Sequence, residues 1–126
     1  MLKSTRDQLA VDVAIESLHL VGQLKLCVQG TSMLPTVRPG SVATIERTEP
    51  DDISPGDIAL TLTAGGLRLH RVVRVLSGSE GLIFTTRGDN HEKPDPPVPA
   101  SNVLGKLVSS CKPGLVTRLL RRMRVA

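Results

Sequence analysis

Aromatic side chains are almost missing from this chain of 126 residues, which contains one Phe and neither Tyr nor Trp. Its core must therefore be aliphatic, and β-branched Val and Ile favour strands. The length allows one domain with a sizeable core. A content of 40% apolar and 22% charged residues is typical of a globular protein.

Cysteine is also scarce, with only Cys27 and Cys111 in the chain. The sequence leaves two possibilities open: the two cysteines form a disulfide, or both are buried free thiols. Histidine occurs three times, at His19, His70 and His91. Because no paired clusters of cysteine and histidine have zinc-binding spacing, we expect neither a metal nor another cofactor.

Long apolar runs are absent, and none approaches the roughly 20 residues that a membrane-spanning helix needs. The longest stretch without a charged residue is 26–37. Near the N-terminus, Asp7, Asp12 and Glu16 occupy positions where a secretory leader has its apolar segment. These absences predict a cytoplasmic protein without a spanning segment.

Excess charge is confined to one end of the chain. The net charge of +4 comes from four arginines near the C-terminus: Arg118, Arg121, Arg122 and Arg124. A neutral body without stacking aromatics argues against nucleic-acid binding. Residues 115–125 are predicted to form a short basic amphipathic helix. Such a helix either makes a peripheral contact with an anionic membrane or packs its apolar face on the body.

The N-terminal segment, residues 4–20, is predicted to be an amphipathic helix that ends at Gly22. Ser4 and Asp7 fit a capping box. Six apolar residues form its predicted stripe: Leu9, Ala10, Val13, Ala14, Leu20 and Val21. His19, near the end of this helix, is expected in solvent or at the helix cap.

From residue 23 onward, short alternating runs separated by turn residues predict a mainly β domain. The predicted strands are residues 24–28, 42–46, 58–62, 67–76, 82–86 and 103–109. Residues 88–102 are expected to form an irregular surface loop. The chain is thus divided into an N-terminal helix at 1–22, the β domain at 23–112 and a basic tail at 113–126.

Three polar patches are candidates for chemistry. In the first, Ser32 lies between Gly30, which permits unusual backbone angles, and Pro35, which fixes its own φ. In the second, His70 stands alone in the longest predicted strand, where an imidazole of pKa about 6.5 is able to take a hydroxyl proton. The third is residues 86–95. Each patch alone equally suits a structural role.

The third patch, residues 86–95, also raises the question of a metal. It lacks the spacing of oxygen ligands and the terminal Glu of a calcium-binding loop. His91 stands beside Asp89 and Glu92, but no second cluster of ligands accompanies them. A polar surface turn is the simpler interpretation.

Taken in order, four blocks of the sequence resemble the type I signal peptidase superfamily. They are Gly-x-Ser-Met-x-Pro-Thr from Gly30, Pro-Gly-Asp-Ile from Pro55, His-Arg-Val-Val from His70, and Gly-Asp-Asn from Gly88 followed by Asp95. The match covers residues 28–108. Bacterial members commonly have a lysine where this chain has His70, which is similar to the archaeal and endoplasmic-reticulum branch. The resemblance implies the coiled antiparallel β-sheets of the catalytic core that signal peptidases share with self-cleaving repressors.

The same resemblance implies a Ser-His-Asp endopeptidase that cleaves a peptide or preprotein. Ser32 would be the nucleophile and His70 the general base. Asp95 would orient the imidazole, as the third member of such a triad does. Asp89 would pair with Arg71 or hold the loop, and the two aspartates could also exchange roles.

The residues next to the serine are expected to support it. Gly30 and Met33 belong to the same block, and the backbone N–H of Ser32 would meet the oxyanion. Many relatives have a serine where this chain has Gly30, and one lost oxyanion donor costs roughly a hundredfold in rate. Ser41, directly after the turn at residues 38–40, stands where the family usually has an Asp.

The membrane anchors that are typical of the family are not found in this chain. A cytosolic or membrane-surface peptide therefore suits it better as a substrate than a secretory preprotein.

Two alternatives stay open. A self-cleaving repressor-type peptidase shares the fold but uses a lysine base, and residues 1–22 are too short for its DNA-binding domain. The other alternative is a catalytically idle peptide-binding or adaptor module on the same fold. An idle module has no physical need for Ser32, His70 and both aspartates.

Overall fold

The computed structural model describes residues 5–112 and 124–125 and shows a mainly β protein with one N-terminal helix. The helix α1 spans Thr5–Val21, and the short 3-10 helices are η1 (Pro50–Asp52) and η2 (Ala100–Asn102). The strands are β1 (Gln23–Val28), β2 (Val42–Arg47), β3 (Ile58–Thr63), β4 (Gly66–Gly78), β5 (Gly81–Arg87), β6 (Val98–Pro99), β7 (Val103–Cys111) and β8 (Arg124–Val125). Every strand that the sequence predicts is present, and only the short β6 and β8 are additional.

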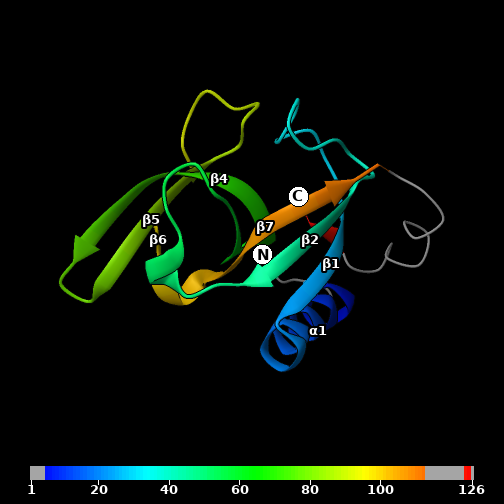
Figure 1. Ribbon diagram of the computed structural model, residues 1–126, viewed down its shortest axis with the longest axis horizontal. Coiled ribbons are helices and arrows are strands. Elements are labelled where there is room, and N and C mark those ends of the chain that lie inside the picture. The colour runs from blue at the N-terminus through cyan, green and yellow to red at the C-terminus, as the bar shows by residue number, and fades with distance from the viewer. Residues whose placement is uncertain (1–4, 113–123, 126) are drawn as a thin grey trace.

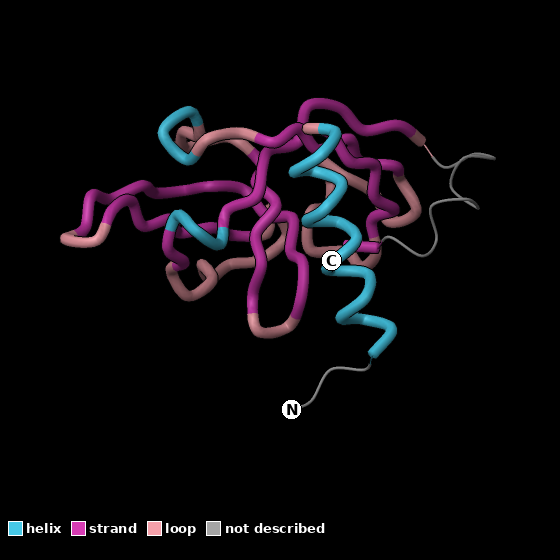
Figure 2. The backbone as a smooth tube through the Cα atoms, turned by 90° about the horizontal axis from the view of Figure 1, so that it is seen from below, coloured by secondary structure: helices cyan, strands magenta, loops and turns pink. Residues whose placement is uncertain are grey.

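The strands of the described chain form one sheet in the order β6-β5-β4-β3-β7-β2-β1-β8. Neighbours pair antiparallel, except that β8 runs parallel to β1. The β4–β5 hairpin extends away from α1 (Figure 1), and α1 lies on one side of the strands (Figure 2). β4 is held between β3 and β5, so its side chains have fixed positions.

Among the residues that the structure describes, two clusters of buried apolar side chains form the core. The larger joins α1 to the strands and to the turn after β1: Ala14, Leu18, Leu24, Leu26, Val28, Met33, Val37, Ala43, Ile45, Ile58, Leu60 and Leu69. The smaller surrounds the single aromatic residue: Phe84, with Ile53, Ala59, Val72 and Val103. Both clusters are aliphatic apart from Phe84, as the composition predicts.

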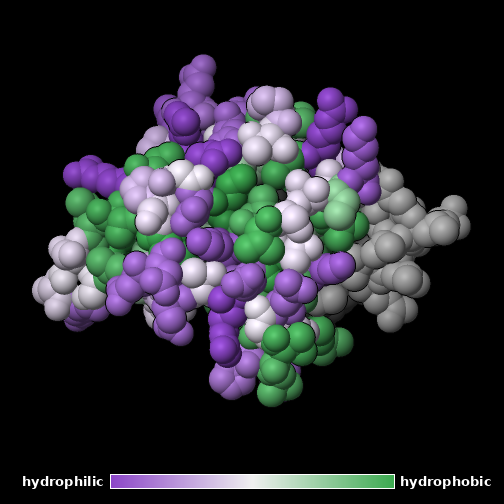
Figure 3. Space-filling model, in the orientation of Figure 1, coloured by the Kyte–Doolittle hydropathy of each residue, from purple (hydrophilic) through white to green (hydrophobic). Residues whose placement is uncertain are grey.

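The face that α1 buries differs from the predicted stripe. Val11, Ala14 and Leu18 are buried, and they recur at the helical spacing of three and four residues. Of the predicted stripe, only Ala14 is fully buried, whereas Leu9 and Leu20 are 62% and 70% exposed. Apolar residues occur on more than one side of this helix, so periodicity alone chose the wrong face. One group of apolar side chains lies at the lower edge of the molecule in Figure 3, where Figure 1 places α1.

The prediction of a helix over residues 115–125 is wrong for its last two residues. Arg124 and Val125 form β8, which pairs with Cys27 and Val28 of β1. The rest of the predicted helix, and the start of the N-terminal capping box at Ser4, lie outside the described residues. No helix in the described ranges is long and apolar enough to cross a membrane.

The two cysteines are free, with Cys27 buried and Cys111 exposed. Val42 of β2 pairs with Cys27 on one side and with Cys111 on the other. Two strand spacings, about 9–10 Å, thus separate their Cα atoms, which is beyond the span of a disulfide. The expectation that both free thiols would be buried is wrong for Cys111, because the end of β7 leaves it open to solvent.

Candidate active site

Ser32 lies in the turn that follows β1, here called the serine turn (residues 30–37). Two side chains of this turn, Met33 and Val37, are buried in the larger core cluster, and the N–H of Val37 donates to the Met33 carbonyl at 2.9 Å. Gly30 has a φ of 77°, a conformation that favours glycine. Ser32 is therefore half-buried on a turn anchored in the core.

His70 lies in the middle of β4, where it pairs with Ala59 of β3. It is only 4% exposed, and its Nδ1 lies 2.6 Å from Oδ2 of Asp95. The bond joins residues 25 positions apart in the chain. The strand and the carboxylate together fix the orientation of the imidazole.

Asp95 is held by three further contacts. Its backbone N–H donates to the Thr86 carbonyl at 2.8 Å, and the Thr86 hydroxyl donates to Oδ2 at 2.7 Å. A guanidinium nitrogen of Arg68 lies 3.7 Å from Oδ1. Burial raises the pKa of Asp95, but the bonds from His70 and Thr86 outweigh it and leave the pKa below its usual value. The carboxylate is ionised at neutral pH and acts only as an acceptor.

The protonation of His70 follows from this environment. Because ionised Asp95 accepts the bond, Nδ1 of His70 carries the proton and Nε2 keeps its lone pair. Burial lowers the pKa of His70 below 6.5, although Asp95 opposes the shift. Arg68 and His91 add smaller contributions that lower this pKa. The imidazole is therefore neutral at pH 7, the state that a general base requires.

Asp89 makes a different set of contacts from Asp95. It accepts two parallel bonds from Arg71, Nε to Oδ1 at 2.8 Å and Nη2 to Oδ2 at 2.7 Å. The hydroxyl of Thr36 donates to Oδ2 at 2.6 Å. The Arg71 bonds, helped by Thr36, hold the pKa of Asp89 below its usual range. Asp89 thus links β4 to the serine turn, whereas Asp95 contacts His70.

The 88–95 loop is also bonded to the serine turn through Asn90. The backbone N–H of Asn90 donates to the Ser32 carbonyl at 2.9 Å, and its side-chain amide donates to the Thr31 carbonyl at 3.2 Å. The N–H of Asp89 contacts the Met33 sulfur at 3.4 Å. These bonds hold the loop that carries both aspartates against the turn that carries the serine.

Gly88 is the point at which the parts of the site meet. A β-carbon at this buried position would lie 2.7 Å from the Ser32 carbonyl oxygen, 3.2 Å from Nε2 of His70 and 3.0 Å from Nδ1 of His91. A residue with a side chain would force these groups apart. The absence of a side chain at Gly88 is therefore required for their close approach.

Two groups of Ser32 are left without partners among the described residues. Neither its hydroxyl nor its backbone N–H forms a hydrogen bond there, so no bond joins Ser32 Oγ to His70. Catalytic hydrogen bonds are often long or misaligned until substrate is bound. The unpaired N–H is the donor that an oxyanion would need.

Several residues of this site belong to the motifs found in the sequence, but the sequence predicted no role for them. Thr86 and Asn90 belong to the third patch and Thr36 to the serine block, but no pattern in one chain indicates that their side chains bond across the site. His91 was considered with Asp89 and Glu92. The structure instead groups it with His70 and Asp95, whose ligand-type atoms all lie within 4.8 Å of one another.

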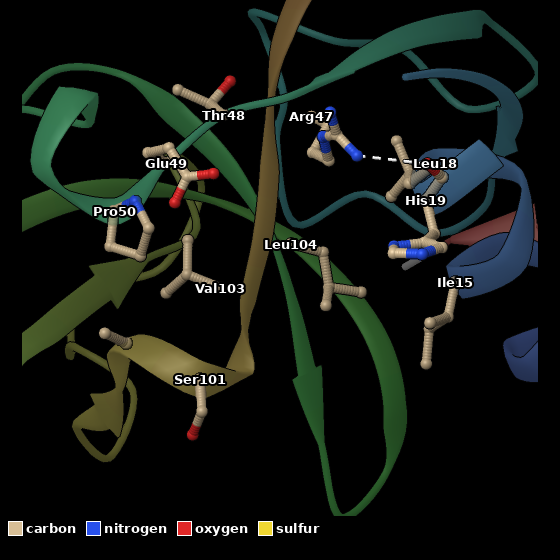
Figure 4. A pocket seen from close by; sticks show the side chains of 11 residues that line it. Ile15, Leu18, His19, Arg47, Thr48, Glu49, Pro50, Ser101, Val103 and Leu104 are labelled. Carbon is tan, nitrogen blue, oxygen red and sulfur yellow. Dashed lines mark hydrogen bonds between the residues drawn. The ribbon is translucent and has the colours of Figure 1, made fainter. Parts of the chain in front are cut away.

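A separate hollow of about 290 Å³ lies between the end of α1 and the segments around η1 and η2 (Figure 4). Ile15, Leu18 and Leu104 give it apolar walls. Arg47 closes one side by donating to the His19 carbonyl at 3.1 Å, the dashed line in Figure 4. The hollow contains none of the residues around Ser32. His19 is exposed here, as expected from its place near the end of the helix.

Ser32, His70 and Asp95 thus come from three separate segments, and the structure brings all three to Gly88 and the end of β5. Asp89 and Arg71 form an adjacent pair, and Gly30 and Met33 shape the serine turn. No protein-family model and no curated protein matches the chain.

Proposed function

We propose that this protein is a serine endopeptidase of the signal peptidase type, with Ser32 as nucleophile, His70 as general base and Asp95 as the orienting carboxylate. The observation that carries the proposal is the 2.6 Å contact between His70 Nδ1 and Asp95 Oδ2. It leaves Nε2 of a buried, neutral imidazole facing the serine turn across Gly88. A structural histidine needs no nitrogen that is left without a partner among the described residues and lies close to the serine turn.

The proposed reaction is acyl transfer to Ser32 followed by hydrolysis. Oγ of Ser32 attacks the carbonyl carbon of the scissile peptide as its proton passes to Nε2 of His70. The C–N bond then breaks, and the imidazolium returns that proton to the leaving amine. Water deprotonated by His70 hydrolyses the acyl-serine ester, which restores the hydroxyl. Asp95 stays ionised and stabilises the imidazolium in both steps.

The backbone N–H of Ser32 is the proposed oxyanion donor. It makes no hydrogen bond among the described residues, so it is able to donate to the oxygen of a tetrahedral intermediate. Gly30, two residues earlier, has no side-chain donor to add. The substrate is proposed to be an extended peptide segment, because only an exposed chain can present its carbonyl to a half-buried serine.

The test is cleavage of a peptide library by the purified protein, with products identified by mass spectrometry. Ser32→Ala is expected to remove all cleavage, and Ser54→Ala, a change at an exposed serine in another loop, is the matched control. A fluorophosphonate, which reacts with activated serine hydroxyls, should add to the parent protein at Ser32 and not to the Ser32→Ala variant. Cleavage that persists in Ser32→Ala would contradict the proposal.

A second candidate is a catalytically idle peptide-binding module on the same fold. It is favoured by one observation, the absence of a hydrogen bond between Ser32 Oγ and His70 among the described residues. Peptide binding without cleavage or labelling, unchanged by His70→Ala, would support this candidate. Loss of labelling in His70→Ala would support the peptidase, because the serine would then depend on its base.

A further inference from the structure

His91 lies beside His70 but has no role in the proposed peptidase mechanism. Its ring meets that of His70 edge to face, with centroids 5.5 Å apart and planes at 88°. It is exposed, whereas His70 is buried. We propose that His70 and His91 together bind a transition-metal ion such as Zn²⁺ through their ring nitrogens, and that the bound ion reversibly blocks the His70 base.

The two nitrogens face one small space. Nε2 of His70 and Nδ1 of His91 lie 3.2 Å and 3.0 Å from the position that a β-carbon on Gly88 would occupy. A side chain on residue 88 would occupy this position, which also lies 2.7 Å from the Ser32 carbonyl oxygen. The ligand-type atoms of His70, His91 and Asp95 lie within 4.8 Å of one another. Zinc binding requires the exposed His91 ring to move until its nitrogen lies at the roughly 2.0–2.1 Å that zinc requires.

The hydrogen bond of His70 to Asp95 prepares it as a ligand. A metal-binding imidazole commonly donates its other N–H to a carboxylate, which fixes the tautomer and raises the basicity of the coordinating nitrogen. His70 donates from Nδ1 to Asp95 at 2.6 Å, and Thr86 holds that carboxylate. The hydrogen bond to Asp95 thus prepares Nε2 of His70 equally well to accept a proton or to bind a metal ion.

The chemistry of these groups selects the kind of ion. Imidazole nitrogens suit Zn²⁺, Cu²⁺ and Ni²⁺, whereas Mg²⁺ and Ca²⁺ prefer sets of oxygen ligands. An ion on Nε2 of His70 occupies the lone pair that would take the proton of Ser32. Metal binding and catalysis therefore exclude each other. This regulatory part rests on the proposed peptidase function, but metal binding itself does not.

The test begins with metal binding to an untagged protein that carries Ser32→Ala, so that no activity is needed, and Cys111→Ser, which removes the exposed thiol as a competing zinc ligand. Calorimetric titration with Zn²⁺ is expected to give one site per chain. His91→Ala in this background should weaken binding at least tenfold, since even the loss of a supporting partner costs 10–100-fold. His19→Ala is the matched control, because His19 is exposed at the other hollow, and it should change binding less than twofold.

Proton NMR identifies the ligands independently. The chain has three histidines, one Phe and no Tyr or Trp, so in D2O, after exchange of the amide protons, the histidine ring signals lie in a nearly empty region of the spectrum. Zn²⁺ should shift or broaden the signals of His70 and His91 and leave those of His19 unchanged, whereas Mg²⁺ should affect none. Unweakened binding in His91→Ala, an absence of zinc binding, or a shift confined to His19 would each overturn the site.

The activity test uses the Cys111→Ser enzyme with Ser32 intact. Zn²⁺ should inhibit peptide cleavage, and a chelator should restore it. His91→Ala should raise the half-inhibiting zinc concentration at least tenfold, with each variant compared to its own rate in chelator. Cleavage that zinc does not inhibit overturns the regulation. Zinc binding by a protein that cleaves no peptide supports the metal site and overturns the peptidase together with its regulation.

Discussion

Nδ1 of His70 donates a 2.6 Å hydrogen bond to Oδ2 of Asp95, and the nearby Asp89 is instead paired with Arg71. The two aspartates lie on one loop, six positions apart, and could not be assigned from spacing alone. Their contacts separate them into a carboxylate that orients the imidazole and one that holds the loop to β4. This separation leads to predictions in which the two aspartates behave differently.

The first prediction compares Asp95→Asn with Asp89→Asn. Asp95→Asn should lower kcat by about 10⁴-fold, because the amide fails to stabilise the correct tautomer and the imidazolium. Asp89→Asn should mainly lower stability, by about 1.5–3 kcal/mol, because Arg71, whose side chain is 31% exposed, loses charge-assisted hydrogen bonds to its partner. Peptide cleavage and urea unfolding of both variants measure these effects. A larger loss of kcat in Asp89→Asn than in Asp95→Asn would reverse the assignment.

A second prediction concerns Thr86 as a positioning residue. Thr86→Val keeps the shape of this buried side chain but removes the hydroxyl that donates to Asp95 at 2.7 Å. A hydrogen bond to a charged group contributes about 1.5–3 kcal/mol, so both stability and kcat should fall. Thr86→Ser, which keeps the donor, should restore kcat. Equal activity of the two variants would show that the hydroxyl does not position Asp95.

A third prediction tests the contact point at Gly88. Gly88→Ala would place a methyl group 2.7 Å from the Ser32 carbonyl oxygen and 3.2 Å from His70 Nε2. The serine turn must then move away from the imidazole, and a displacement of about 1 Å can cost a hundredfold in rate. Gly65→Ala is the matched control, since its β-carbon would meet only the Thr63 hydroxyl at 3.7 Å. Comparable cleavage rates for these two variants would contradict the proposed arrangement.

A fourth prediction is the position of the acid limb in the pH profile of kcat/KM, measured with a chelator present. Burial holds the pKa of His70 below 6.5, with smaller lowering effects from Arg68 and His91, and Asp95 opposes them. The neutral base therefore persists as pH falls through 6.5, and the rate declines only at lower pH. Asp95→Asn removes the opposing effect and should move the limb further down. A midpoint above 6.5 in the parent enzyme would be inconsistent with this environment.

A fifth prediction tests the buried face of α1. Leu18 is 3% exposed and packs in the larger core cluster, whereas Leu20 is 70% exposed. Leu18→Ala should lower the free energy of unfolding by about 2–5 kcal/mol, because it removes buried apolar surface and leaves a cavity. Leu20→Ala should change it by less than about 0.5 kcal/mol. Thermal or urea unfolding of the pair distinguishes this face from the one that periodicity predicts.

Local patterns in the sequence were sufficient for most of the fold. Alternating runs bounded by Gly, Pro and Asp predicted the six longer strands, because strand period and turn chemistry are local properties. The same patterns located a helix at the N-terminus. They failed for the face of α1 and for β8, because those depend on the surface or strand edge that the rest of the chain presents.

The sequence by itself determined which side chains could form the site: Ser32 on a constrained turn, His70 in a strand, and two aspartates on a polar loop. Only the tertiary structure decided which aspartate contacts His70, that Asn90 and Thr36 bond the loop to the serine turn, and that His91 lies beside His70. These relations join residues far apart in the chain, such as Thr36 and Asp89 at a separation of 53 positions. Sequence patterns report the conformation of neighbouring residues, whereas hydrogen bonds between distant segments exist only after the sheet has brought those segments together.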